Sequence, residues 1–197
     1  MISLLPPSSS FALKEWATAC LLLKEGRQIM IIRKGGIDKA DKDFTTELSI
    51  DSEFLLFPTY EHQNESLIKK EFHTDLSDTI EENDVPGLIN LSAFAKITHK
   101  FEIQSTEVIN RISKFHLWNE AYTDKRINWK PRMPAIVALL RVYPLIQPQA
   151  LPILPEYGSC KSIVDLGQEV PMGELEPVIQ DAEYQSICKE IQDLITN

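Results

Sequence analysis

Residues 135–146 read AIVALLRVYPLI, and they form the most apolar run in the chain. Pro134 precedes the run and Pro144 lies close to its end, so residues that disfavour sheet interiors bracket it. A continuous apolar run between such breakers is typical of a strand that is buried on both faces. The run therefore predicts a central strand, and we expect a sheet around it.

Three segments upstream are predicted to supply further strands. Between residues 88 and 103, apolar residues recur at every second position, which indicates a pair of strands. Residues 53–57 predict a short buried strand that Pro58 ends, because proline lacks the amide donor of a sheet ladder. Residues 16–36 hold two apolar runs around a charged, glycine-containing turn, which predicts a hairpin. The alternative for the first of these runs is a helix over residues 11–20.

Helices are predicted from capping residues and from apolar residues at helical spacing. Four are expected, at residues 60–72, 105–112, 119–127 and 176–195. Thr59 is placed to cap the first, and Glu61 lies where the helix dipole favours an acid. The last is amphipathic with an acidic outer face. Residues 35–51 and 73–87 are polar or acidic and are predicted to be loops.

Length and composition are those of an ordinary soluble globular protein. The chain has 197 residues, of which 43% are hydrophobic and 25% charged. We predict a flexible arm at residues 1–10, one α+β domain at 11–168, and a C-terminal linker and amphipathic helix at 169–197. The sheet is expected to be bent and mostly antiparallel, or closed into a small β-barrel, with short helices around it. By analogy of fold alone, such a barrel would be PUA-like, as in RNA-binding folds associated with pseudouridine synthases.

Charge is distributed unevenly along the chain. The net charge of −9 argues against broad, non-specific binding to nucleic acid or to anionic lipid. Residues 1–110 and 142–197 each carry a net charge of −7, whereas residues 111–141 carry +5. We call residues 111–141 the basic island.

Neither the cysteines nor the hydropathy indicate export. No apolar run is long enough to span a bilayer, and the N-terminus, MISLLPPSSS, lacks the basic start of a signal peptide. Cys20, Cys160 and Cys188 form no C-x-x-C pair, so neither a disulfide framework nor a cysteine zinc site is indicated. We therefore expect a cytoplasmic protein with no membrane contact.

Signatures of common enzymes are absent from the sequence. It has no Walker A, dinucleotide-binding, nucleophile-elbow or H-E-x-x-H motif. The four histidines lie far apart without metal-ligand spacing, so neither a metal site nor a cofactor is predicted. Residues 33–36, RKGG, follow a predicted strand and have the composition of a weak phosphate cradle that includes Lys34; the alternative is a flexible turn with a charged edge.

The strongest functional signal is the basic island, RISKFHLWNEAYTDKRINWKPRMPAIVALLR, in which aromatic residues interleave with Lys and Arg. Aromatic faces stack on bases while Lys and Arg contact phosphates, so this pattern suits a single-stranded or flipped-base ligand. The predicted ligand-binding residues in the island are His116, Trp118, Tyr122, Arg126, Trp129, Lys130 and Arg132. The alternative is that Trp118 and Trp129 anchor the core and that Arg126 or Arg132 pairs with the acidic blocks.

Several strings in the chain resemble a known family. ALKEWATAC, RKGGI, FLLFPTYEHQ, HLWNEAYTDKRINWKPRMP, LLRVY and EYGSCKS look like the cyanobacterial family known as domain of unknown function 1802, over about residues 11–166. The C-terminal helix is expected to lie outside this resemblance. Two positions depart from the family pattern: Leu117 stands where the family usually has Ile, and Ile163 stands where it has Trp. The resemblance implies no activity, but it implies a link to restriction-modification systems through members that are joined to nuclease-like domains.

These observations support three hypotheses. The first is a non-catalytic module that binds nucleic acid or a modified base through the basic island, with a role in restriction-modification or defence. The second is an enzyme acting on phosphate esters or nucleotides, with Lys34 and Arg132 holding phosphate and Glu61 and His62 in acid–base roles; adjacent side chains point apart, which weakens that pairing. The third is an interaction or assembly protein that uses the acidic C-terminal helix.

No catalytic residue is assigned from the sequence. Tyr60 and His62, in the polar stretch that follows the strand at residues 53–57, are further candidates for ligand binding.

Overall fold

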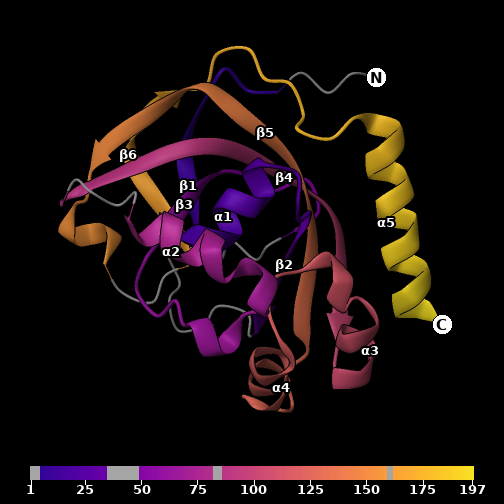
Figure 1. Cartoon of the computed structure of the whole chain (residues 1–197). Coiled ribbons are helices and arrows are strands. Elements are labelled where there is room, and N and C mark those ends of the chain that lie inside the picture. The colour runs from indigo at the N-terminus through magenta and orange to yellow at the C-terminus, as the bar shows by residue number, and fades with distance from the viewer. Residues whose placement is uncertain (1–4, 35–48, 82–85, 159–161) are drawn as a thin grey trace.

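The structure is a computed structural model that describes residues 5–34, 49–81, 86–158 and 162–197. Six strands form one mixed sheet in the order β2-β5-β4-β3-β1-β6, with helices packed around it (Figure 1). The strands are β1 (Ser8–Trp16), β2 (Met30–Lys34), β3 (Glu53–Thr59), β4 (Leu88–Ile103), β5 (Ala135–Pro152) and β6 (Ile163–Pro171). Only β1 and β3 pair in parallel, and every other neighbouring pair is antiparallel. The predicted α+β fold is confirmed, but the barrel alternative is wrong, since β2 and β6 form the two edges of an open sheet in the described residues.

Strands β4 and β5 form the long centre of the sheet, and Figure 1 shows both as arcs. They pair antiparallel along their length, and the register shifts at two places, between Leu91 and Ala93 and between Ile97 and His99. Such irregularities bend and twist a strand pair. The central strand predicted at residues 135–146 is confirmed, and the bend of the sheet originates in this pair.

Two expectations about this region need correction. Residues 88–103 form one long strand rather than a pair of strands. Pro144 does not end β5, which continues to Pro152. Because Pro144 lies opposite Ala93, next to the first register shift, its missing amide falls where the ladder is already irregular.

The hairpin predicted at residues 16–36 is wrong. Strand β1 is followed directly by helix α1 (Ala17–Lys24), and β2 pairs with β5 instead. Nearly all of α1 is buried, so it has no polar face that would reveal a helical period. Gly26 has a φ of +72°, and the turn expected to join two strands instead ends a helix. The alternative helix over residues 11–20 is also wrong, because its first half lies in β1.

Strand β3 does not end at Pro58. It runs to Thr59, with Pro58 opposite Glu15 of β1 in the parallel pair. On its other side β1 pairs with β6, a strand that the sequence patterns did not predict. Residues 8–10 belong to β1 and are therefore held in the sheet.

The segment after β3 differs from its prediction. Residues 60–72 contain turns and two short 3₁₀ helices, η1 (Glu65–Leu67) and η2 (Lys70–Phe72), rather than one α-helix. Helix α2 (His73–Glu81) forms where an acidic loop was expected. His62 has a φ of +66°, and this left-handed conformation cannot continue a helix.

Side-chain hydrogen bonds also explain why residues 60–72 do not form one α-helix. The Thr59 hydroxyl donates to the Glu15 carbonyl at 3.0 Å and therefore caps no helix. The Asn64 side chain instead accepts from the Ser66 N–H at 2.9 Å and starts η1.

The remaining predicted helices are confirmed. They are α3 (Thr106–Arg111), α4 (Glu120–Asn128) and α5 (Asp181–Thr196). Two short 3₁₀ helices, η3 (Ser113–Phe115) and η4 (Pro155–Tyr157), complete the elements of the described residues. Asn119 caps α4, since its side-chain oxygen accepts from the Tyr122 N–H at 3.2 Å. Most of the loop predicted at residues 35–51 lies outside the described residues.

The helices cover the curved sheet unequally. Helix α1 packs against β1, β3, β4 and β5, and it contributes Cys20 and Leu23 to a core that also holds Phe54 and Leu140. Helices α3, α4 and α5 pack with β2 and β5 around a second core. Figure 1 shows α5 standing at the side of the molecule next to α3. The basic island therefore runs from the last residue of α3 through η3 and α4 into the first part of β5.

Candidate ligand-binding site

The aromatic side chains of the basic island point mostly inward. His116, Trp118 and Tyr122 are buried, and they form a ladder. The Trp118 and Tyr122 rings stack with centroids 5.1 Å apart, and His116 lies 5.8 Å from Trp118. Trp16 from β1 contacts the edge of Tyr122 at 5.5 Å. Trp118 and Tyr122 stack on each other, and burial of all three island rings keeps them from an external base in this conformation.

Distant segments hold this ladder in place. The Leu117 N–H donates to the Gln28 side chain at 2.9 Å, and Trp118 forms an isolated bridge with Ile68. The extended backbone at residues 116–119 is thereby fixed between the end of α1 and the η1 region. The inward direction of the aromatic side chains follows from these long-range contacts.

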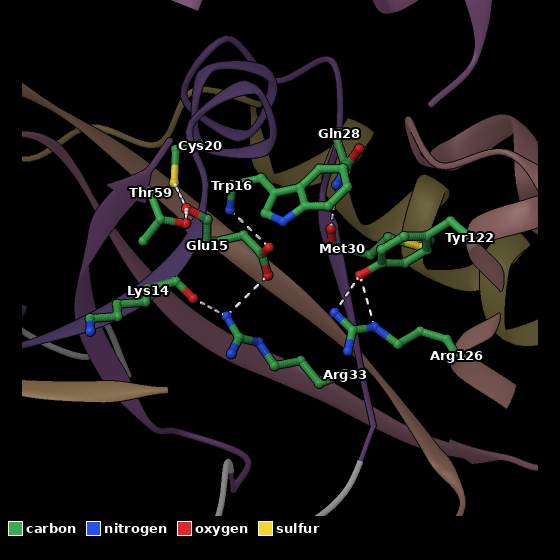
Figure 2. A network of polar contacts seen from close by, with 10 residues as sticks. All are labelled: Lys14, Glu15, Trp16, Cys20, Gln28, Met30, Arg33, Thr59, Tyr122 and Arg126. Atoms are coloured by element: carbon green, nitrogen blue, oxygen red, sulfur yellow. Dashed lines mark hydrogen bonds and ion pairs between the residues drawn. The ribbon is translucent and has the colours of Figure 1, made fainter. Parts of the chain in front are cut away.

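Arg126 is bound to the ladder. Its Nε and Nη2 donate to the Tyr122 hydroxyl at 3.0 and 2.8 Å, and its guanidinium lies 5.0 Å from the ring centroid (Figure 2). Burial raises the pKa of Tyr122 to about 12, although the nearby Arg126 charge opposes the rise. Tyr122 is therefore neutral at physiological pH. The Nε and Nη2 edge of the Arg126 guanidinium is already bonded to the Tyr122 hydroxyl.

Figure 2 shows a buried ion pair beside the ladder. The Arg33 Nη2 lies 3.1 Å from the Glu15 carboxylate and also donates to the Lys14 carbonyl. The other Glu15 oxygen accepts from the Trp16 N–H at 2.9 Å. Since β2 and β1 are not neighbours in the sheet, Arg33 joins two strands that the curve brings together.

Cys20 lies next to this ion pair. Its thiol contacts the Glu15 carbonyl at 3.8 Å, and burial raises the pKa of the thiol, with the Glu15 charge adding to the rise. A protonated, buried thiol is a poor nucleophile. The geometry thus gives Cys20 a packing role.

Lys34 is buried. Its ammonium donates to the Ile127 carbonyl at 2.7 Å, and desolvation lowers the pKa of Lys34. This bond ties β2 to α4. A phosphate-binding role for Lys34 stays a prediction.

The exposed part of the predicted site lies after α4. Trp129 is 48% exposed, and the Lys130 ammonium lies 4.7 Å from its ring centroid. Helix α4 ends as the Trp129 N–H donates to the Lys125 carbonyl at 3.1 Å, and Lys130 turns the chain with a φ of +48°. Arg132 is also exposed. We call Lys125, Trp129, Lys130 and Arg132 the Trp129 surface.

Residues 60–63 are placed outside the basic island. Glu61 and His62 are exposed in the turn after β3, and Tyr60 is half-buried. Gln63 has a structural role, because its side-chain oxygen accepts from the N–H and the hydroxyl of Thr18, each at 2.9 Å. Acid–base roles for Glu61 and His62 stay predictions.

The acidic face of α5 is partly neutralised within the molecule. Asp181 pairs with Arg141 and Glu190 pairs with Lys114, both at 2.5 Å. The island residues in these pairs are Lys114 and Arg141, whereas the alternative named Arg126 or Arg132, and Arg126 donates to Tyr122 instead. Binding of a protein partner by α5 stays a prediction.

Sequence reasoning missed Glu15, Trp16, Gln28, Arg33 and Lys69, all of which support the island from other segments. Glu15 lies within the mostly apolar string ALKEWATAC, and this position could have indicated the ion pair, because a buried carboxylate needs a charged or hydrogen-bonding partner. Among the described residues, no group of three or more His, Cys, Asp or Glu side chains is arranged to hold a metal ion. No helix in the described ranges has the length and apolarity to cross a membrane.

The class of protein defined by this geometry is an α+β domain with an open, curled sheet and an aromatic–basic helical side. The chain belongs to the family described as "Domain of unknown function (DUF1802)", whose model matches residues 12–190. The match includes most of α5, so the expectation that the resemblance ends at residue 166 is wrong. No curated protein and no solved structure matches the chain.

Proposed function

We propose that the protein is a non-catalytic module that binds single-stranded nucleic acid through the Trp129 surface. The observation that carries the proposal is the exposed Trp129 ring with the Lys130 ammonium beside it. A large exposed aromatic flanked by cations is the arrangement that stacks on a base and contacts the adjoining phosphates.

The surrounding charges favour the same ligand. Lys125, in the last turn of α4, and Arg132, on the connection after it, are exposed, while the chain as a whole carries a net charge of −9. A local cationic surface on an acidic protein favours specific contact over general electrostatic attraction to duplex DNA. A role in restriction-modification or defence is part of this proposal through the family resemblance alone, and a cytoplasmic location is carried over from the sequence-based expectation.

Replacing Trp129 by alanine tests the proposal. Because base–aromatic stacking contributes roughly 1–3 kcal/mol, we expect the dissociation constant for a labelled single-stranded oligonucleotide to rise about 5- to 150-fold. Fluorescence anisotropy at low ionic strength measures this change. Phe11→Ala removes another exposed aromatic, on β1, and is expected to leave binding unchanged.

The phosphate contacts are tested separately. Arg132→Ala should weaken binding and reduce the dependence of the affinity on salt, measured at about 50 and 200 mM. Lys189→Ala on α5 is the matched control, because Lys189 pairs with Asp193 away from this surface. Absence of binding by the unmodified protein at low salt, or equal affinity in the Trp129→Ala variant, would refute the proposed function.

A further inference from the structure

A groove of about 630 Å³ lies between strand β6 and the segment that runs from the end of β5 into η4. On the β6 side it is lined by the consecutive residues 163–168. Successive residues of a strand point to opposite faces of the sheet, so a continuous stretch borders one groove only along an edge of the strand. Because β1 occupies one edge of β6, the groove runs along the other edge, which no described strand covers.

The first half of this edge offers backbone groups to a partner. The Lys14 N–H donates to the Ser162 carbonyl at 2.8 Å, and the antiparallel register with β1 continues from there to Asp165. Since backbone groups alternate in direction along a strand, those of Ile163 and Asp165 point away from β1 and towards the groove. After Asp165 the register shifts and Gly167 has a φ of +67°, so the regular part of the edge is short.

The wall opposite β6 is apolar and partly exposed. Pro152 and Leu154 line it, and Leu154 is 37% exposed. Two neighbours extend the apolar surface beside the groove: Leu88, which is opposite Pro152 in the β4–β5 pair and 37% exposed, and Ile153, which is 48% exposed. Exposed apolar side chains that gather at one place, with polar residues around them, mark an interaction site rather than ordinary surface.

Every charged side chain in the lining is acidic. These side chains are Glu156 and Asp165, and both are exposed. The Asp165 carboxylate accepts from the Gly167 N–H at 2.9 Å, which orients it without neutralising it. The Lys14 ammonium donates to the Tyr157 carbonyl from β1 and is not part of the lining. The groove therefore favours a ligand that carries positive charge.

An extended peptide meets all three features at once. If it pairs antiparallel with β6, its residues opposite Ile163 and Asp165 lie on the face of the Asp165 carboxylate, and the residue between them lies on the face of Val164. Val164 belongs to the same buried cluster as Leu166 and Tyr157, so this second face is apolar. A cation opposite Asp165 with an apolar neighbour therefore matches both faces.

A second copy of the chain suits the groove less well. Residues 142–197, which include β6 and η4, carry a net charge of −7, and a symmetric contact would bring two such segments together. We propose that the groove binds an extended basic segment of another protein, in which lysine or arginine alternates with apolar residues, as an added strand on β6. This inference goes beyond the proposed function, because it uses neither the Trp129 surface nor a nucleic acid.

The probe is a fluorescently labelled hexapeptide of alternating lysine and valine with both ends blocked. Anisotropy on the full chain at about 150 mM salt, where general attraction between exposed charges is screened, should give a dissociation constant of up to about 1 mM. In the proposed register the lysine N–H groups bond to β6 and the valine N–H groups point away. N-methylation of the lysine amides should weaken binding at least about 5-fold, whereas N-methylation of the valine amides should not. No binding, or equal binding of the two methylated peptides, would overturn the inference.

Two variants locate the binding, each with a matched control. Asp165→Asn removes the charge but keeps an oxygen for the Gly167 N–H, and it should weaken binding about 2- to 5-fold, whereas Glu174→Gln removes an exposed charge outside the lining and should have no effect. Leu154→Ala should weaken binding about 5- to 10-fold, whereas Ile146→Ala, at a 74% exposed position of β5 outside the lining, should not. Equal losses in Asp165→Asn and Glu174→Gln would mean attraction to the acidic surface in general and would contradict the assignment.

Two further measurements separate the possible occupants and the two proposals. Light scattering that gives the mass of two chains, returned to one chain by Leu154→Ala, would identify a second copy as the occupant and would overturn the inference. Trp129→Ala should leave peptide binding unchanged, because Trp129 does not line the groove. Peptide binding without oligonucleotide binding would refute only the proposed function, and oligonucleotide binding without peptide binding would refute only this inference.

Discussion

Replacing Glu15 by alanine is expected to lower the free energy of unfolding by about 3 kcal/mol, the lower end of the range for breaking one side of a buried ion pair. Glu15 is 8% exposed, and its partner Arg33, at 18%, retains limited contact with water. Without the carboxylate, the Arg33 guanidinium stays in this position with only the Lys14 carbonyl as acceptor, and the Trp16 N–H loses its partner. Urea unfolding of the variant measures the loss.

A double-mutant cycle with Arg33→Met identifies the source of the loss. If the penalty comes from an unpaired charge, the double variant should lose less stability than the two single variants together. Lys189→Ala breaks an exposed pair on α5 and should change stability by less than about 0.5 kcal/mol. A Glu15→Ala effect as small as that control would show that the pair does not hold the two strands together.

Acidification is expected to destabilise the protein through His116. The pKa of His116 is about 4 in the folded protein, against an ordinary value of 6.5, so between these two pH values the unfolded chain binds a proton that the folded protein does not. Stability is therefore retained above about pH 6.5 and is lost as the pH falls towards 4. The contribution of His116 to this loss is about 3 kcal/mol.

The comparison of His116→Phe with the unmodified protein isolates this contribution. Both proteins carry the same carboxylates, so acid effects from those groups cancel in the difference. Urea unfolding at about pH 7 and pH 4 should show a smaller loss of stability in the variant, by about 3 kcal/mol. Equal losses would mean that His116 titrates alike in the folded and unfolded chain.

Local patterns were sufficient for the elements whose signal lies within a single segment of the sequence. The apolar run of β5, the Asn119 cap of α4 and the amphipathic period of α5 are all readable from one segment. The hairpin at residues 16–36 failed because α1 is buried nearly all round, and a buried helix and a buried strand have the same uniform apolar composition. Strand β6 buries Val164, Leu166 and Val170 at alternating positions, but Gly167 and Gln168 interrupt the apolar alternation in the sequence and hide the strand.

The composition of the candidate site could be predicted from the sequence, but the directions in which its side chains point could not. The positive charge of the basic island and the exposed Lys130 and Arg132 follow from the sequence. Whether Trp118 or Trp129 faces solvent depends on Gln28 and Ile68, which are remote in the chain.

The pairing of β1 with β6 has a consequence for the order of folding. Ser8 of β1 is opposite Pro171 of β6. The first strand in the described residues therefore completes its ladder with the last strand. Closing so long a loop is slow compared with forming the local helices α3 and α4. During synthesis, β1 leaves the ribosome long before β6 exists, and one edge of β1 stays open until the C-terminal segment emerges. The nascent chain must therefore carry an unsatisfied strand edge on β1 until β6 has been synthesised.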